Sequence, residues 1–364
     1  MDNNAKIVDF FLGANSSKGF YSLFKQLEIP VKSWRSFVIK GGPGTGKSNM
    51  MKKIVDNFED KRGLIEKIHC SSDIDSLDGV ILHNCNCSIV DATSPHVIEP
   101  DLPGVYETTV NFCQAFDEEL LNSRFEQIIS AKNAGSIYHE KCCKLLNCAQ
   151  ILLNDNYEIA LACTDTKKIE NFAKRIKALE FSLKGNGAKE HVRYLSAVTN
   201  KGITAYLETP TKLCKNIYVI KDDFSCTSSL FLSLLREYAL ASELEIFTCF
   251  CSMKPTSKIE HIFIPELNLG FMTWNKFLDL SQINPYKVVN YARFTDKEKL
   301  GAYKQRISFN KKLATQLINS AVQTLKNAKI CHDQLEKFYN DAVDFSLIDA
   351  QTSEVIRKML KRYK

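Results

Sequence analysis

Short apolar runs separated by turn-forming residues dominate the first hundred positions of the chain. Residues 36–40 form a β-branched and aromatic run that predicts a buried strand. After a glycine-rich interval, apolar residues recur at helical spacing and predict a helix over residues 49–58. Residues 64–70 and 87–91 predict two further strands, the first of them parallel. Alternating strands and helices predict an α/β fold with a parallel sheet.

The glycine-rich interval is a phosphate-binding P-loop motif, preceded by a strand and followed by a helix, as that motif requires. Its glycines let successive backbone amides turn toward a phosphate chain, and the helix adds its positive N-terminal end. Lys47 would reach the β- and γ-phosphates, and the Ser48 hydroxyl would ligate Mg²⁺. The predicted nucleotide-binding residues are Gly41, Gly42, Pro43, Gly44, Thr45, Gly46, Lys47, Ser48 and Asn49.

Acidic side chains at the ends of the next strands are the candidates for catalysis. Asp91 ends an apolar strand and is predicted to hold Mg²⁺ together with Ser48; the alternative is a carboxylate that caps the next turn. Within the acidic loop 71–79, Asp73 is the first choice for a catalytic role, with Asp75, Asp78 and His69 behind it. The alternative for Asp73 and Asp75 is capping of a short helix.

Two sequence features that the chain lacks bear on its expected rate of hydrolysis and on its nucleotide. Ala92 follows Asp91, where many ATP hydrolases place a glutamate that aligns water, so we expect slow hydrolysis. No Asn-Lys-x-Asp guanine motif occurs in a suitable place, which favours ATP over GTP.

The second half of the chain repeats the first. Residues 12–20 align with 195–203, and residues 37–40 with 218–221, each followed later by long helical periodicity. The expected architecture is two tandem P-loop NTPase-like parallel-sheet cores related by duplication, each with an appended α-helical hairpin. The predicted domains are 1–185, the active copy, and 186–364, a degenerate copy without the phosphate-binding motif; the boundary is the stretch 183–189.

In the second copy, residues 222–229 align with the P-loop and contain neither glycine nor lysine. Two aspartates in this segment would repel phosphate, so we expect no ordinary nucleotide site there. The second half could pack as a pseudo-dimer partner, supply a residue to the first site, or bind something else. Arg193, Arg236 and Arg293 are candidates for such a residue, and ordinary surface arginines are the favoured interpretation.

Composition and charge exclude several classes of protein. Hydrophobic residues make up 45% and charged residues 25%, which indicates a globular chain. The net charge of +6 is dispersed apart from a C-terminal basic cluster over 357–364, which disfavours a nucleic-acid partner. No apolar run is long enough to span a bilayer, and thirteen cysteines in such a chain favour reduced thiols and a cytoplasmic location. The spacing His83-x-Cys85-x-Cys87 lacks a second ligand pair, so buried small side chains are favoured over a zinc site.

Several motifs together resemble a known family. Residues 18–20, the P-loop with residues 51–54, residues 69–73 and 76–79, and residues 89–96 look like an uncharacterised Firmicutes family of internally duplicated P-loop ATPases. The resemblance implies the additional-strand, AAA-like branch of P-loop ATPases, ATP with Mg²⁺, and a bacterial cytoplasmic protein. It also adds Thr93 and His96, which match a motif after the magnesium strand. The family keeps a glycine-rich loop in both halves, and this sequence departs from it at residues 222–229.

The function expected from the sequence is that of a Mg²⁺-dependent ATPase acting as a switch or motor. A kinase for a small molecule or nucleotide is the first alternative, and a nucleotide-gated protein-binding module with negligible turnover is the second. The predicted helical hairpins are the candidate surface for a protein partner. We expect no contact with a membrane.

Overall fold

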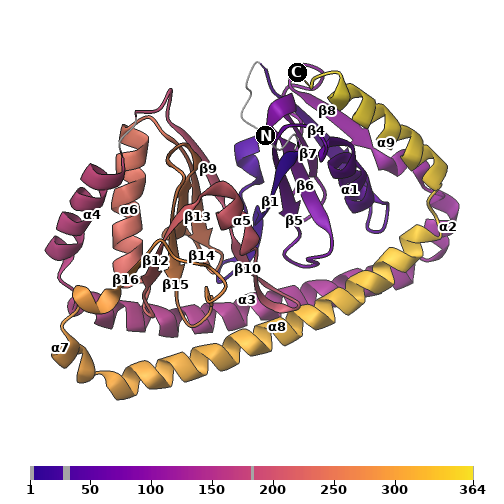
Figure 1. The fold of residues 1–364 in the computed structure, drawn as a ribbon. Coiled ribbons are helices and arrows are strands. Elements are labelled where there is room, and N and C mark those ends of the chain that lie inside the picture. Colours follow the sequence, from indigo (N-terminus) through magenta and orange to yellow (C-terminus); the bar gives the residue numbers. More distant parts are fainter. Residues whose placement is uncertain (1–3, 28–32, 182–183, 364) are drawn as a thin grey trace.

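The computed structural model describes residues 4–27, 33–181 and 184–363 and contains two six-stranded, mostly parallel sheets (Figure 1). Leu183 and Lys364, which belong to the predicted boundary and basic cluster, lie outside these residues. In spatial order the first sheet is β1 (Ala5–Phe11), β5 (Gly63–His69), β6 (Leu77–Leu82), β7 (Cys87–Asp91), β4 (Arg35–Lys40) and β8 (Glu107–Asn111). The second is β9 (Lys189–Arg193), β13 (Glu245–Cys251), β14 (Lys254–Ile264), β15 (Leu269–Trp274), β12 (Asn216–Lys221) and β16 (Lys287–Asn290).

The two sheets share one pattern of strand direction. β6 runs antiparallel to β5 and β7, and β14 runs antiparallel to β13 and β15, while the other neighbouring strands in both sheets are parallel. Each half also carries a small hairpin, formed by β2 (Gly13–Ser16) with β3 (Gly19–Ser22) and by β10 (Ser196–Thr199) with β11 (Gly202–Ala205). The reversed strand therefore occupies the same place in both sheets.

The inner faces of the two sheets pack against each other. Phe10 of β1 stacks on Phe247 of β13 with ring centroids 5.7 Å apart, within one core that draws side chains from both sheets. The outer face of the first sheet is covered by α1 (Lys47–Phe58) and α9 (Phe345–Leu360), and that of the second by α4 (Thr166–Glu180) and α6 (Cys226–Ala241) (Figure 1). The short helix α5 (Glu208–Leu213) contacts β1.

Two long antiparallel helices run across both halves (Figure 1). They are α3 (Phe125–Ala162) and α8 (Lys304–Asn340), preceded by the short helices α2 (Glu118–Ser123) and α7 (Lys297–Gly301). Arg124 pairs with Asp341 at 2.8 Å near one end, and Arg306 pairs with Asp155 near the other. Small and aliphatic side chains, including Ala149 and Ala321, are buried where the two helices meet.

The predicted hairpin in each half is wrong, because the halves exchange their last helices. The long helix of one half pairs with that of the other, α4 packs on the second sheet, and α9 packs on the first. Two isolated antiparallel bridges, Phe116 with Val343 and Thr164 with Thr295, fix the exchange. The two bridges join matching positions of the two halves, because Thr295 lies as far along the chain from Phe116 as Val343 lies from Thr164. The predicted boundary near residue 185 thus divides the sheets but not the helices that cover them.

A buried ion pair also joins the halves. Arg193 of β9 donates hydrogen bonds to both carboxylate oxygens of Glu66 on β5, at 2.6 and 2.9 Å, and both side chains are almost fully buried. His83 lies 2.7 Å from the same carboxylate. Burial raises the pKa of Glu66, but Arg193 and His83 lower it by more, so the carboxylate is held ionised.

Most predicted elements of the first half are confirmed: strands β4, β5 and β7 and helix α1 lie where the hydrophobic pattern puts them. The acidic loop is shorter than predicted, because β6 already begins at Leu77. No helix follows Asp73. Cys85 and Cys87 are buried thiols, as expected, and all thirteen cysteines are free. Among the described helices, none is both long and apolar enough to cross a bilayer.

Candidate phosphate-binding site

The P-loop connects β4 to α1 at the edge of the sheet where the parallel strands end. Gly44 and Gly46 have φ of 67° and 83°, in the left-handed region that favours glycine, and Gly46 is the N-cap of α1. The buried Thr45 hydroxyl donates to the Gly42 carbonyl at 2.8 Å and fastens the loop on itself. The loop therefore has the backbone curvature that a phosphate cradle requires.

Lys47 and Asp91 face each other beside this loop. The Lys47 ammonium donates to the Gly42 carbonyl at 2.5 Å and lies 3.6 Å from Asp91 Oδ2. Their side chains are only 10% and 14% exposed, so little solvent screens the attraction between them. The predicted lysine and acid are thus brought together.

Thr93 and Ser48 hold their neighbours by hydrogen bonds. Asp91 Oδ1 accepts from the Thr93 amide at 2.9 Å and from its hydroxyl at 2.6 Å, which is the turn-capping geometry considered as the alternative for Asp91. Ser48 Oγ accepts from the Leu77 amide at 3.0 Å, so the start of β6 lies against the start of α1. Oxygen atoms of Ser48 and Asp91 are ligands that suit Mg²⁺, which prefers hard oxygen donors.

The structure adds a buried pair that sequence reasoning ranked low. Asp78, the second residue of β6, places Oδ2 3.0 Å from His96 Nε2, and both residues are 5% exposed. Burial lowers the pKa of His96, but Asp78 and Asp91 raise it by more, to above its ordinary value of 6.5. His96 Nδ1 is buried and has no hydrogen-bond partner among the residues described. Because β6 runs antiparallel to β5 and β7, its first residues lie at the edge of the sheet where those two strands end. This direction places Asp78 beside the P-loop.

The other predicted acids and His69 are held elsewhere. Asp73 accepts from the Ser76 hydroxyl at 3.0 Å and lies 3.3 Å from Lys329 of α8. Asp75 pairs with Lys201 of the second half at 2.7 Å. His69 Nε2 lies 2.9 Å from Asp9 Oδ1. Within the part of the chain that the structure describes, none of the hydrogen bonds and ion pairs of these three residues reaches the P-loop.

The C-terminal end of α8 lies directly on the P-loop, which the sequence did not predict. A methyl group on Gly42 would lie 2.6 Å from the Tyr339 ring, and one on Gly44 would meet the Asn340 side chain and lie 2.9 Å from the Glu336 carbonyl. Gly46 faces the first turns of α9, with Ile348 3.7 Å from such a methyl group. The absence of side chains at Gly42 and Gly44 thus lets α8 approach the loop closely, and Gly44 and Gly46 also let the loop curve.

The three candidate arginines do not reach this site. Arg193 is the buried partner of Glu66, so the interpretation as a surface residue is wrong for it. Arg236 pairs with Glu190, and Arg293 lies 5.2 Å from the centre of the Phe172 ring.

The corresponding loop of the second half is shorter, and the carboxylate of its first residue, Asp222, accepts hydrogen bonds from backbone amides that follow it. Only residues 222–225 separate β12 from α6, whereas residues 41–46 separate β4 from α1, so the gap-free alignment with 222–229 is wrong by two residues. Ser225, with φ of 56°, takes the N-cap place of Gly46. Asp222 accepts from the amides of Phe224 at 3.1 Å and Ser228 at 2.9 Å. An internal carboxylate therefore occupies the end of α6 where a phosphate would otherwise bind.

No protein-family model, curated protein or solved structure matches this chain.

Proposed function

We propose that this chain is a Mg²⁺-dependent ATPase that acts as a switch, and that its two halves arose by duplication of a P-loop unit. The observation that carries the proposal is the packing of α8 on the P-loop. Gly42 and Gly44 meet Tyr339, Asn340 and Glu336, and the other end of the same helix lies in the second half. A ligand in the loop must therefore compete with, or rearrange, a helix that spans the molecule.

The roles that we assign follow the geometry of the loop. Lys47 would exchange its contact with the Gly42 carbonyl for phosphate oxygens, whose negative charge is the stronger partner. Ser48 and Asp91 would hold Mg²⁺, which would neutralise phosphate charge. We assign proton acceptance or water alignment to Asp78 with His96. The charges of Asp91 and Lys47 both act on His96, and the amide of Leu77, the residue before Asp78, donates to Ser48. Asp73, in contrast, is engaged by Ser76 and Lys329.

The strand order supports the resemblance to the additional-strand branch in one respect. β7 lies between β4 and β6, so Asp91 is on the strand next to the P-loop strand, whereas Asp78 is on a strand that β7 separates from it. As an alternative to the role in proton transfer, we therefore name Asp78 as a second candidate for the magnesium acid, beside Asp91.

The test is ADP and phosphate production from ATP with Mg²⁺, by wild type, Lys47→Ala and the matched control Lys52→Ala. Lys52 is exposed on the same helix, so its substitution changes the net charge equally without touching the loop. We expect slow phosphate release by wild type and Lys52→Ala, and none by Lys47→Ala. ADP without free phosphate, only in the presence of small metabolites, would instead indicate a kinase. Binding of ATP without turnover would favour the nucleotide-gated module.

A further inference from the structure

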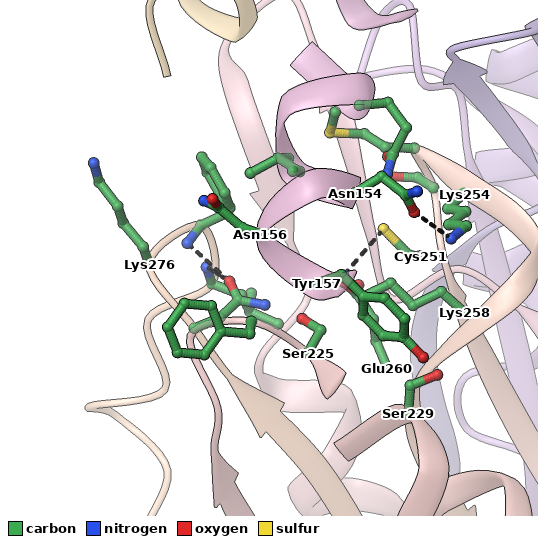
Figure 2. A pocket seen from close by; sticks show the side chains of 18 of the residues that line it. Asn154, Asn156, Tyr157, Ser225, Ser229, Cys251, Lys254, Lys258, Glu260 and Lys276 are labelled. Carbon is green, nitrogen blue, oxygen red and sulfur yellow. Dashed lines mark hydrogen bonds and ion pairs between the residues drawn. The ribbon is translucent and has the colours of Figure 1, made fainter. Parts of the chain in front are cut away.

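The second half contains a cavity of about 100 Å³ that the ATPase proposal does not use (Figure 2). It lies at the N-terminal end of α6, in the place that corresponds to the P-loop edge of the first half. Its wall is built from α3, the β10–β11 hairpin, β14 and the turn before it, the loop into α6 with the first turn of α6, the segment after β15, and Lys311 of α8. Elements from both halves of the chain therefore enclose it.

The charges that line this cavity are mainly positive. Four lysines and two acids line it: Lys254, Lys258, Lys276, Lys311, Asp223 and Glu260. Lys258 pairs with Glu260 at 2.9 Å and Lys311 with Asp223 at 3.0 Å, which balances both acids. Lys254 and Lys276 form no ion pair with any residue that the structure describes; they donate to the Asn154 amide oxygen at 3.0 Å and the Thr315 hydroxyl at 3.2 Å.

Lys258 and Glu260 are held inside the wall. Their side chains are 20% and 9% exposed, and the Lys258 ammonium also lies 3.7 Å from Cys251 Sγ (Figure 2). Burial lowers the pKa of Lys258, but Cys251 and Glu260 raise it by more, so the ammonium stays charged. Moving a charged side chain out of water costs free energy, and charged side chains in partly buried positions are concentrated at functional sites.

Size and geometry limit the ligand. An apolar cavity of about 150 Å³ holds benzene, so this smaller space accepts a molecule of only a few heavy atoms. The amide hydrogen-bond donors of the α6 N-terminus are already used by Asp222, so they offer no place for a triphosphate. The Tyr157 ring, 5.4 Å from the Lys254 ammonium, gives the charged end of the cavity an apolar side (Figure 2).

We propose that this cavity is a second ligand site, for a small anion bearing a carboxylate or phosphate group, with Lys254 as its principal counter-charge. The site is independent of ATP binding. Because α8 forms part of its wall, an occupant would contact the helix whose other end lies on the P-loop.

The experiment uses Lys47→Ala protein, so that the P-loop does not contribute, and follows its melting temperature on titration with inorganic phosphate, acetate and the uncharged analogue acetamide. We expect a saturable rise with phosphate or acetate and none with acetamide. Adding Lys254→Gln should weaken the binding about tenfold or more, the effect of losing a charged hydrogen bond. Lys254→Arg should retain binding, which separates loss of charge from misfolding.

The matched control is Lys326→Gln, an exposed lysine on α8 whose loss changes the net charge by the same amount. It should leave the affinity unchanged. The proposal is overturned if neither anion gives a saturable rise. It is equally overturned if Lys254→Gln and Lys326→Gln weaken the response alike, since that result would reflect net charge alone.

Discussion

Gly42→Ala tests the contact between the P-loop and α8. The added methyl group would lie 2.6 and 2.7 Å from two carbons of the Tyr339 ring and 3.1 Å from Phe116, so the ring must move. The φ of Gly42 is outside the left-handed region, so the cost comes from steric overlap and not from backbone strain. Overpacking of this kind costs about 1–3 kcal/mol.

Tyr339→Ala should relieve this cost, because it removes the ring that the methyl group meets. We expect Gly42→Ala to lower the free energy of unfolding by about 1–3 kcal/mol in wild type, and by about 1 kcal/mol less in the Tyr339→Ala background. Urea denaturation followed by circular dichroism, at constant m-value, measures all four proteins of this cycle.

Gly46→Ala is the matched control within the same loop. Its methyl group would meet nothing closer than 3.7 Å, but its φ of 83° imposes backbone strain of about 1–2 kcal/mol. That cost should be the same with and without Tyr339. If Gly42→Ala also costs the same in both backgrounds, the end of α8 does not pack on the loop as described.

Two further substitutions test buried pairs. The pKa of His96 is raised in the fold, so its ion pair with Asp78 stabilises fully below pH 6.5 and this contribution is lost as pH rises through the folded pKa. The stability difference between wild type and His96→Gln should therefore shrink from acidic to alkaline pH in urea denaturation series; a constant difference would contradict the assignment. Glu66→Gln should destabilise by about 3–5 kcal/mol, because it leaves Arg193 charged and buried without its partner. Asp75→Asn, which breaks an exposed pair, should cost less than about 1 kcal/mol; equal losses in thermal denaturation would refute the role of the buried pair.

The local elements of the first half could be predicted because their signals are local. β4, the glycine-rich loop and α1 follow from apolar runs, glycine positions and helical spacing within about 25 residues. The facing of Lys47 and Asp91 also follows, because β4, which leads into the loop before Lys47, and β7, which ends at Asp91, are parallel neighbours. These inferences needed no knowledge of distant contacts.

The other features of the fold and site depend on strand direction, helix pairing and long-range contacts, which the hydrophobic pattern does not encode. Asp78 belongs to the polar run 71–79, which is typical of a loop, and an apolar strand such as β6 has the same pattern in either direction. The sequence therefore does not place Asp78 at a strand start that faces Ser48. The pattern of an amphipathic helix shows that the helix packs but not against which partner, so the sequence does not predict the exchange of α4 and α9. The contact of Tyr339 with Gly42 joins residues almost three hundred positions apart, and nothing in either segment identifies the other.

The most direct test of the switch is amide hydrogen exchange over residues 336–348, with and without Mg²⁺-ATP, in wild type and Lys47→Ala. Because the end of α8 lies on the loop that would hold the phosphates, we predict faster exchange in this segment when ATP binds to wild type, and no change in Lys47→Ala. Unchanged or slower exchange in wild type under conditions where ATP is bound would contradict the claim that the nucleotide rearranges this helix.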